Sequence, residues 1–261
     1  PIGNLEDITY RAVRILDEVT LIAAEDTRKA RVLLDRYEIT TPVTSFFEGN
    51  EHRKQRVILE ALAQGDVALI SEAGTPTISD PGYPLVSAAI EHHVPVTLVP
   101  GSSAHTAALV ASGLPTDRFL FLGFLPRQAR DQAALLDEVS LLQATLILYE
   151  SPRRVIATLE LLLDALGDRP VALCRELTKL HEEVWRGNLT GALAHLRAQL
   201  PRGEFTIVVG GATDEDLRWN EDRVRAALTE SMAGGLSHSQ AAREVAKQSG
   251  WNRSEVYDLK T

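Results

Sequence analysis

One stretch of the chain combines the residue types that bind and act on a small ligand, namely glycines, hydroxyls and carboxylates. It runs from Ser71 to Gly82 and reads Ser-Glu-Ala-Gly-Thr-Pro-Thr-Ile-Ser-Asp-Pro-Gly. Glycine lets a ligand approach the backbone N–H groups, and the carboxylates of Glu72 and Asp80 can hold its hydroxyl or amino groups. A tight turn that only connects two elements is the alternative, but it needs neither carboxylate. We therefore predict a binding site in this loop.

The elements on either side of the loop place it at a strand end. Residues 67–70 are apolar and closed by turn residues, which predicts a buried strand, and the spacing of Leu85, Ala89 and Ile90 predicts a helix after it. Strand, glycine loop and helix is the order in which α/β proteins hold ligands. A second junction of this type follows, with a predicted strand over 94–99 and a helix that ends near residue 111.

Charged residues follow another predicted strand. Residues 21–24 are apolar, and Glu25, Asp26, Thr27 and Arg28 come directly after them. Open α/β sheets place their chemistry at the carboxyl ends of strands, which indicates a second part of the site. The alternative is that Asp26 or Thr27 caps the next helix, which we expect to end near residue 37. One group of residues can do both, so both interpretations stay open.

The order of predicted elements divides the chain into three parts. Strands alternate with helices over residues 1–114, which indicates a mostly parallel sheet. Turn-forming residues at 113–117 mark a boundary, and a second α/β series occupies residues 115–218. Its predicted strands are 119–124, 144–149, 171–174 and 205–209. From residue 219 to 261 the pattern is helical only. The predicted fold is two α/β domains with a small helical module.

The helical module has a spacing of its own. Ala241, Ala242, Val245, Gly250 and Val256 are placed as in a helix-turn-helix, with packed small residues, a glycine turn and a second helix. An ordinary helical hairpin packed on the body is the alternative. The module contains six basic and six acidic residues, although the whole chain carries a net charge of −9. An acidic protein binds nucleic acid only through a focused basic patch.

Several classes of protein are disfavoured by composition and missing motifs. No apolar run reaches the length of a membrane helix, and the single cysteine, Cys174, lies in an apolar stretch where it fills the core. One cysteine forms no internal disulfide, which fits a reducing cytoplasm. A P-loop, a Gly-x-Gly-x-x-Gly fingerprint and a Gly-x-Ser-x-Gly elbow are absent. The seven histidines form no i, i+4 pair, so we predict no metal site.

Motifs in a fixed order give the chain a resemblance to a known family. The resemblance is carried by Pro1-Ile2-Gly3-Asn4-Leu5, Glu25-Asp26-Thr27-Arg28, residues 71–76, Asp80-Pro81-Gly82, residues 100–104, Gly123-Phe124-Leu125-Pro126, residues 149–154, Arg175-Glu176-Leu177-Thr178-Lys179 and Gly203-Glu204. Together they resemble the small-subunit ribosomal RNA methyltransferase I group of the tetrapyrrole methylase superfamily. This resemblance implies S-adenosylmethionine as methyl donor, bound in a cleft between two α/β domains, and a homodimer. It also implies 2′-O-methylation of a cytidine in the decoding region of 16S ribosomal RNA, in the cytoplasm.

The residues of the site follow from this resemblance and from the predicted strand ends. We expect the donor to be bound by glycines and small residues, namely Gly74, Thr75, Pro76, Ser102, Ser103, Ala104, Leu177, Thr178 and Gly203. We expect the catalytic groups to be Glu25, Asp26, Arg28 and Lys179, with Glu72 and Glu150 as alternatives. A ribose 2′-hydroxyl is a weak nucleophile, so a base or a charge that favours the alkoxide should assist. The sequence does not rank these groups.

Basic residues in two regions are expected to contact the RNA. Arg127, Arg130, Arg153 and Arg154 follow two predicted strands, and they form either a phosphate-facing cluster or a set of solvated side chains. Arg243 and Lys247 share one helix face in the helical module, and Arg253 opens the next helix. Two other functions stay open. One is methylation of a corrin or sirohaem precursor on the same fold, and the other is a nucleotide-sensing regulator that binds nucleic acid.

The sequence departs from the family pattern at two places. The family has a strand before the turn at Pro1, so we expect the first sheet to lack one strand in the sequence as given. The family also tends to carry histidines just before Asn50, where this chain has Phe47 and Gly49. A histidine base from this loop is therefore not expected here.

Overall fold

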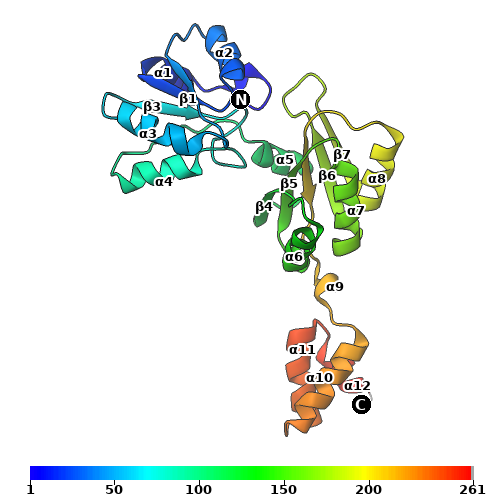
Figure 1. The fold of residues 1–261 in the computed structure, drawn as a ribbon. Coiled ribbons are helices and arrows are strands. Elements are labelled where there is room, and N and C mark those ends of the chain that lie inside the picture. The colour runs from blue at the N-terminus through cyan, green and yellow to red at the C-terminus, as the bar shows by residue number, and fades with distance from the viewer. Residues whose placement is uncertain (260–261) are drawn as a thin grey trace.

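The computed structural model describes residues 1–259 and contains two β-sheets and a separate group of helices (Figure 1). The first part of the chain builds the smaller sheet. Its elements are η1 (Leu5–Asp7), α1 (Tyr10–Glu18), β1 (Leu21–Ala24), α2 (Thr27–Arg36), β2 (Val43–Ser45), α3 (Glu51–Ala61), β3 (Val67–Ile70), α4 (Tyr83–Glu91) and α5 (Ala104–Ser112).

The first sheet is parallel, as predicted, with the order β2-β1-β3. Its two faces are covered by different helices. Leu16 of α1 and Leu34 of α2 pack with Ile22 on one face, and Ile58 of α3 and Leu85 of α4 pack with Ala23 on the other. Parallel strands are buried in this way because each crossover places a helix against the sheet. The carboxyl ends of β1 and β3 consequently lie side by side.

The strand predicted over residues 94–99 is wrong. This segment has no regular secondary structure, and Val96 and Leu98 are 51% and 67% exposed. Val99 and residues 68–70 of β3 line the same cavity, so a gap separates the segment from the edge of β3. A strand requires a hydrogen-bonded neighbour. The apolar composition of the segment was insufficient without a strand on which to pair.

The second part of the chain contributes eight elements, five strands that form the second sheet and three helices. They are β4 (Phe119–Phe124), α6 (Ala129–Val139), β5 (Thr145–Glu150), α7 (Val155–Leu166), β6 (Pro170–Arg175), β7 (Glu183–Asn188), α8 (Leu189–Ala198) and β8 (Phe205–Val209). The strand order is β4-β5-β8-β6-β7, and only β4 and β5 are parallel neighbours. The sequence predicted four of these strands but missed β7, because Glu183–Asn188 contains few apolar residues.

Helices from both parts of the chain cover the second sheet. Helices α6, α7 and α8 pack on one face with Leu136, Leu159 and Leu193. Helix α5 packs on the other face, where Ala108 and Leu109 contact the core of the sheet. The segment between β3 and β4 therefore crosses from the first sheet to the second (Figure 1). This crossing brings the loop before α5 close to the carboxyl ends of β4 and β5.

The remaining described residues form helices only, as predicted, and they stand apart from both sheets (Figure 1). They are α9 (Asp214–Leu217), α10 (Glu221–Ala233), α11 (His238–Ser249) and α12 (Arg253–Asp258). Their core is their own and contains Val224, Leu228, Ala241, Val245 and Val256. Capping boxes at Ser237 and Asn252 fix the starts of α11 and α12. The last two residues of the predicted module lie outside the described residues.

Candidate functional site

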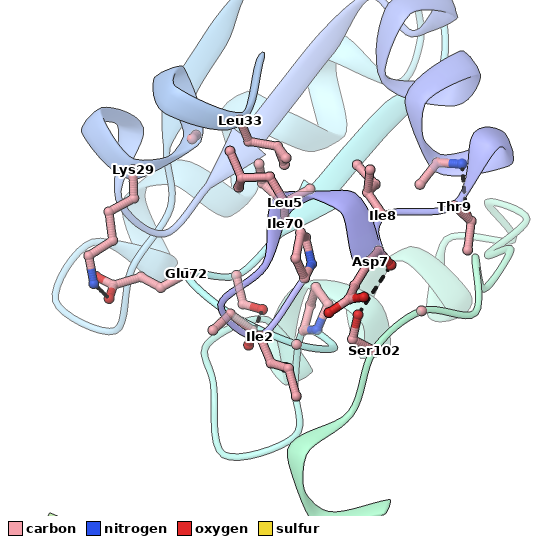
Figure 2. A pocket seen from close by; sticks show the side chains of 18 of the residues that line it. Ile2, Leu5, Asp7, Ile8, Thr9, Lys29, Leu33, Ile70, Glu72 and Ser102 are labelled. Carbon is pink, nitrogen blue, oxygen red and sulfur yellow. Dashed lines mark hydrogen bonds and ion pairs between the residues drawn. The ribbon is translucent and has the colours of Figure 1, made fainter. Parts of the chain in front are cut away.

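A cavity of about 450 Å³ lies where the first sheet faces the second. It is lined by the N-terminal turn, helices α1 and α2, the loop after β3, residues 99–102, Lys179 and Glu204. Figure 2 shows it from close by, with Ser102 bonded to Asp7 and Lys29 paired with Glu72. A volume of this size accommodates a nucleoside-sized ligand.

The two ends of the cavity differ in chemistry. One end is the edge of β3 that pairs with no strand of residues 1–259, and apolar side chains such as Leu16, Leu33 and Ile70 line it. The other end contains Gly3, Gly74, Ser102, Lys179 and Glu204, which also line the cavity. A ligand with ribose hydroxyls and charges needs polar partners, so we assign the candidate site to this second end.

Three hydrogen bonds hold the N-terminal turn in the polar end. The N–H of Asn4 donates to Oγ1 of Thr178 at 3.1 Å, and the N–H of Gly74 donates to the carbonyl of Pro1 at 3.0 Å. The hydroxyl of Ser102 donates to the carbonyl of Asp7 at 3.3 Å. The turn, both predicted glycine loops and the loop after β6 are therefore joined at one place.

Among the predicted donor residues, Gly74, Pro76 and Ser102 line this cavity, whereas Thr75, Ser103, Thr178 and Gly203 do not. Gly74 has φ +82° and a space beside it in which the nearest atoms to an added Cβ are Ile2 at 3.6 Å and Ser102 O at 3.8 Å. Such a backbone favours glycine and leaves room for close approach. Ala104 and Leu177 line a smaller cavity of about 40 Å³ with Ile2 and Lys179. The Ser103 hydroxyl lies 3.0 Å from the His105 ring instead of capping α5.

Lys179 is held between two carboxylates at the mouth of the site. Its ammonium lies 3.0 Å from Glu176 and 2.8 Å from Glu204. Burial lowers the pKa of Lys179, but the hydrogen bonds to Glu204 and Glu176 outweigh it and the pKa is raised. Lys179 therefore keeps its charge at neutral pH. The backbone N–H of Glu204 also donates to Glu176 at 2.9 Å, which ties the segment before β8, with Gly203, to the same group.

The charged residues after β1 turn out to be linked to one another. Asp26 accepts hydrogen bonds from the N–H groups of Arg28 and Lys29 as the N-cap of α2, and its carboxylate also pairs with the Arg28 guanidinium. These bonds, led by the one from the Arg28 side chain, lower the pKa of Asp26 to about 2. Glu25 accepts the N–H of Glu72 at 3.0 Å, and Glu72 pairs with Lys29. Asp26 is therefore the cap of α2, and Lys29 and Glu72 line the cavity whereas Glu25, Asp26 and Arg28 do not.

Asp80, which the sequence analysis placed in the binding loop but not among the catalytic groups, has a different environment. Burial raises the pKa of Asp80 to about 6, the charges of Glu25 and Glu72 add to the rise, and a hydrogen bond with Ser71 opposes it. The pKa of Asp80 is thus shifted towards neutral pH. A carboxyl group with such a pKa is suited to accept a proton near pH 7. Its position at the end of the strand–loop–helix unit was the available sequence signal.

The predicted arginines are brought together only in part. β4 and β5 are parallel neighbours, so Arg127, Arg130, Arg153 and Arg154 all follow the same edge of the sheet. Arg154 donates to the carbonyl of Leu125 at 2.9 Å and lies 3.4 Å from buried Glu150. It therefore fixes the loop after β4, and Glu150 is occupied by it, Ser151 and Thr158. The other three arginines are exposed.

The predicted RNA-binding residues of the helical module lie far from this edge. Arg243 and Lys247 are exposed on α11, and Arg253 donates to the Ser239 hydroxyl at 2.8 Å. Figure 1 shows α11 and α12 well separated from the two sheets. Within residues 1–259 there is no group of side chains that could hold a metal ion and no helix long and apolar enough to cross a membrane.

Comparison with known proteins agrees with this architecture. The family described as Tetrapyrrole (Corrin/Porphyrin) Methylases matches residues 1–193. A Synechocystis protein named Ribosomal RNA small subunit methyltransferase I is 46% identical over 262 aligned positions, which are 99% of this chain and 94% of that protein. A Thermotoga maritima protein of the same name is 46% identical over 212 positions, 81% of this chain and 95% of its own length.

A solved structure supports the fold. Uroporphyrin-III-C-methyltransferase from Thermus thermophilus has a TM-score of 0.57 and 22% identity, covering 80% of this chain and 90% of that one. The predicted fold class and the resemblance drawn from the ordered motifs are confirmed. The chain belongs to the tetrapyrrole methylase family.

Proposed function

We propose that this protein transfers a methyl group from S-adenosylmethionine to the RNA of the small ribosomal subunit. The proposed acceptor is the 2′-hydroxyl of a cytidine in the decoding region of 16S ribosomal RNA. The observation that carries the proposal is the hydrogen-bonded junction of the N-terminal turn with Gly74, Ser102 and Thr178 around one cavity. The names of the relatives from Synechocystis and Thermotoga support the RNA of the small subunit as substrate.

The residues at the polar end of the cavity fit the methyl donor. Gly74 and Ser102 offer backbone groups to a nucleoside, and Glu204, 78% exposed at its side chain, offers a carboxylate for hydroxyl groups. Methyl transfer from a sulfonium is an in-line displacement. Positioning of the donor and acceptor and exclusion of water therefore account for most of the rate enhancement. When bound, S-adenosylmethionine supplies the electrophilic methyl group. The chain holds it through Gly74, Thr75, Pro76, Ser102, Ser103, Ala104, Leu177, Thr178 and Gly203.

The charged groups act on the acceptor oxygen in this proposal. A ribose hydroxyl loses its proton more readily beside a base or a fixed positive charge. Asp80 supplies a carboxyl group with a pKa of about 6, and Lys179 supplies a charge that two carboxylates keep in place. Asp26, Arg28 and Glu25 complete the catalytic set, with the Asp26 carboxylate held ionised by Arg28.

The assembly and division of the chain are also proposals. We take residues 1–114, 115–218 and 219–261 as the domains, with α5 packed on the second sheet from the first domain. We propose a homodimer that acts on the small ribosomal subunit in the cytoplasm. Sedimentation equilibrium of the purified protein tests the dimer, because a dimer doubles the mass of 28.6 kDa.

One assay tests the activity and its two alternatives together. The protein is incubated with tritiated S-adenosylmethionine and either undermethylated small subunits or uroporphyrinogen III. We expect label in 16S ribosomal RNA, at a nucleotide whose phosphodiester resists alkali because its 2′-oxygen is blocked. Label in the tetrapyrrole alone would establish the corrin or sirohaem alternative. RNA binding without any transfer of label would establish the regulator.

A further inference from the structure

Four aromatic rings meet at the carboxyl ends of β4 and β5, beside the loop that opens α5. They belong to His105, Phe121, Phe124 and Tyr149, which we name the ring cluster. The ring centroids of His105 and Phe121 are 4.7 Å apart and stacked, those of Phe121 and Tyr149 are 4.9 Å apart, and those of Phe124 and Tyr149 are 5.7 Å apart. None of these rings was assigned a role by the sequence.

A break in strand pairing places Phe124 in the ring cluster. Phe121 is paired with Ile147, but Gly123 is paired with the next residue, Leu148, so β4 contains one extra residue at this point. Residues three apart on a regular strand face opposite sides of the sheet. Here the β-bulge turns Phe124 to the side of Phe121 and Tyr149. A bulge that redirects a side chain beside an active site is a recurrent structural device.

Gly123 is the residue that permits the bulge. Its φ is +64°, in the left-handed region that glycine adopts without strain. An added Cβ would lie 3.1 Å from the Ser79 hydroxyl of the loop after β3. The bulge is therefore packed against the same loop that holds Gly74 and Asp80. The ring cluster therefore lies beside the loop that also carries Gly74.

The rings differ in exposure in a way that suits a ligand. His105, Phe121 and Tyr149 are half-buried and fixed to one another, and the N–H of His105 donates to the Tyr149 hydroxyl at 3.2 Å. Phe124 is 51% exposed and is not part of the buried core. A rigid ring that leaves half its surface in water offers a stacking platform. Burial lowers the pKa of His105, so its ring is neutral near pH 7.

The surroundings of Phe124 supply the other parts of a nucleotide site. Arg127 and Arg130 follow β4 and Arg153 follows β5, all three exposed. Aromatic rings beside cations are the combination that binds single-stranded nucleic acid, since bases stack and phosphates pair.

We propose that the ring cluster receives the base of the target nucleotide, unstacked from its RNA, with Phe124 as the stacking surface. The three exposed arginines bind the neighbouring phosphates. The ribose then lies between the ring cluster and the loop of Ser103, on the side of the methyl donor. This inference rests on the proposed function and adds how the acceptor is presented.

The direct test replaces the stacking ring and keeps its apolar character. Phe124→Leu removes stacking, Phe124→Tyr restores it, and Phe119→Leu is the matched control at the opposite end of the same strand, 47% exposed. We expect Phe124→Leu to raise KM for small subunits roughly five- to hundredfold. Phe124→Tyr and Phe119→Leu should stay within about twofold of the parent, and donor affinity by calorimetry should not change in any variant.

A second measurement does not depend on turnover. A short RNA with pyrrolocytosine at the target position brightens when that base leaves its neighbours, so its emission reports unstacking. We expect the parent and Phe124→Tyr to change the emission and Phe124→Leu to fail. Gly123→Ala, which disturbs the bulge, should reproduce the loss while circular dichroism and donor affinity confirm that it is folded.

The outcomes separate this inference from the proposed function. If the parent methylates small subunits and Phe124→Leu matches it in KM and in emission, the ring cluster does not hold the base. If Phe124→Leu instead dissociates a dimer in sedimentation, Phe124 is a contact between copies and the inference is overturned. If no RNA is methylated, the proposed function fails, and the emission of the pyrrolocytosine RNA still decides whether Phe124 receives a base.

Discussion

The backbone N–H of Asn4 donates to the side-chain oxygen of Thr178 at 3.1 Å, and this bond joins two residues that are 174 positions apart in the chain. It connects the N-terminal turn, beside the first sheet, to the loop that follows β6 in the second. Thr178 has φ +67° and its own N–H donates to Glu182 at 2.6 Å. The acceptor is therefore held in place before any ligand binds, which lowers the entropic cost of binding.

Loss of this acceptor should weaken donor binding. Thr178→Val keeps the size and branching of the side chain but leaves the N–H of Asn4 without its partner. A typical hydrogen bond contributes about 1 kcal/mol, so we expect S-adenosylmethionine to bind roughly fivefold more weakly by calorimetry. Thr190→Val on α8 is the control, since Thr190 is exposed and distant from the cavity. Equal affinity of both variants would remove Thr178 from the donor site.

A substitution at Gly74 should show whether its loop binds the methyl donor or only connects β3 to α4. In Gly74→Ala the new Cβ meets only ordinary contacts at 3.6 and 3.8 Å, so the folded chain accommodates it, although φ +82° adds strain. A bound nucleoside would lose its close approach to the backbone, and we expect at least about a tenfold loss of affinity. Gly113→Ala, with φ +77° and open space around it, matches the strain away from the site. Similar donor affinity in the two variants would assign the loop a connecting role.

Asp80 should make stability depend on pH in the opposite direction from a paired carboxylate. Burial raises its pKa to about 6 in the folded state, whereas an unfolded chain has about 3.9. Between these values the folded state keeps a proton that the unfolded chain has lost, so the free energy of unfolding falls as the pH rises through this window. Above pH 6 the folded state carries the full free-energy cost of burying an ionised Asp80.

Substitution of Asp80 should remove this dependence. At pH 7.5 we expect the free energy of unfolding of Asp80→Asn, measured with urea, to exceed that of the parent by about 1–2 kcal/mol. Near pH 4 the two free energies of unfolding should be equal. Asp137→Asn, an exposed carboxylate on α6, should change neither value. The same Asp80 variant should slow methyl transfer, since the proposed base is lost. A stability difference that is independent of pH would mean that the pKa of Asp80 is the same in the folded and unfolded states.

Two charge variants should separate chemistry from donor binding. Asp26→Asn retains an N-cap for α2, because asparagine caps as well as aspartate. Lys179→Met removes the charge between Glu176 and Glu204. If these charges act on the acceptor oxygen, single-turnover rates fall about a hundredfold and donor affinity changes little. Normal single-turnover rates in both variants would leave Asp26 as a cap and Lys179 as a structural ion pair.

Much of the fold was predictable because it depends on local pattern. The strands at 21–24, 67–70, 119–124 and 205–209 have the predicted bounds, since each is an apolar run closed by turn residues. The segment 94–99 is also mostly apolar, although it contains Pro95, and it is not a strand, because strand formation also needs a neighbour. The polar strand β7 was missed because it has a neighbour to pair with but lacks the apolar composition of the other strands. Its partner β6 determines it, not its own composition.

The candidate site was predictable by motif but not by geometry. Strand-end motifs located Gly74, Ser102 and Thr178, yet no spacing indicates that Asn4 reaches Thr178. The pKa of Asp80 depends on burial, which the sequence does not contain. The side to which Phe124 points depends on one extra residue in β4, and strict alternation would have placed Phe124 opposite Phe121.

The helical module folds around a core of its own, and we propose that it is an accessory unit for binding RNA. Its core is formed by its own helices, and Arg243 and Lys247 are exposed on one face of α11 without an ion pair among the described residues. The alignment with the Thermotoga relative includes 95% of that protein but only 81% of this chain. About a fifth of this chain therefore lies outside the alignment. Because the module shares no core with the sheets, its removal should leave the donor site intact.

Truncation after Leu217 should therefore separate donor binding from RNA binding. We expect the shortened protein to bind S-adenosylmethionine normally but to methylate small subunits at least about tenfold more slowly at low subunit concentration. In the full chain, the double variant Arg243→Ala, Lys247→Ala should release about one to two fewer counterions on binding RNA. The measurement is the slope of the logarithm of affinity against the logarithm of salt concentration. Arg56→Ala, an exposed cation on α3, controls for net charge, since its pair with Glu60 is a surface pair of little energetic consequence. A full methylation rate after truncation, with an unchanged salt slope in the double variant, would show that the module does not dock the substrate.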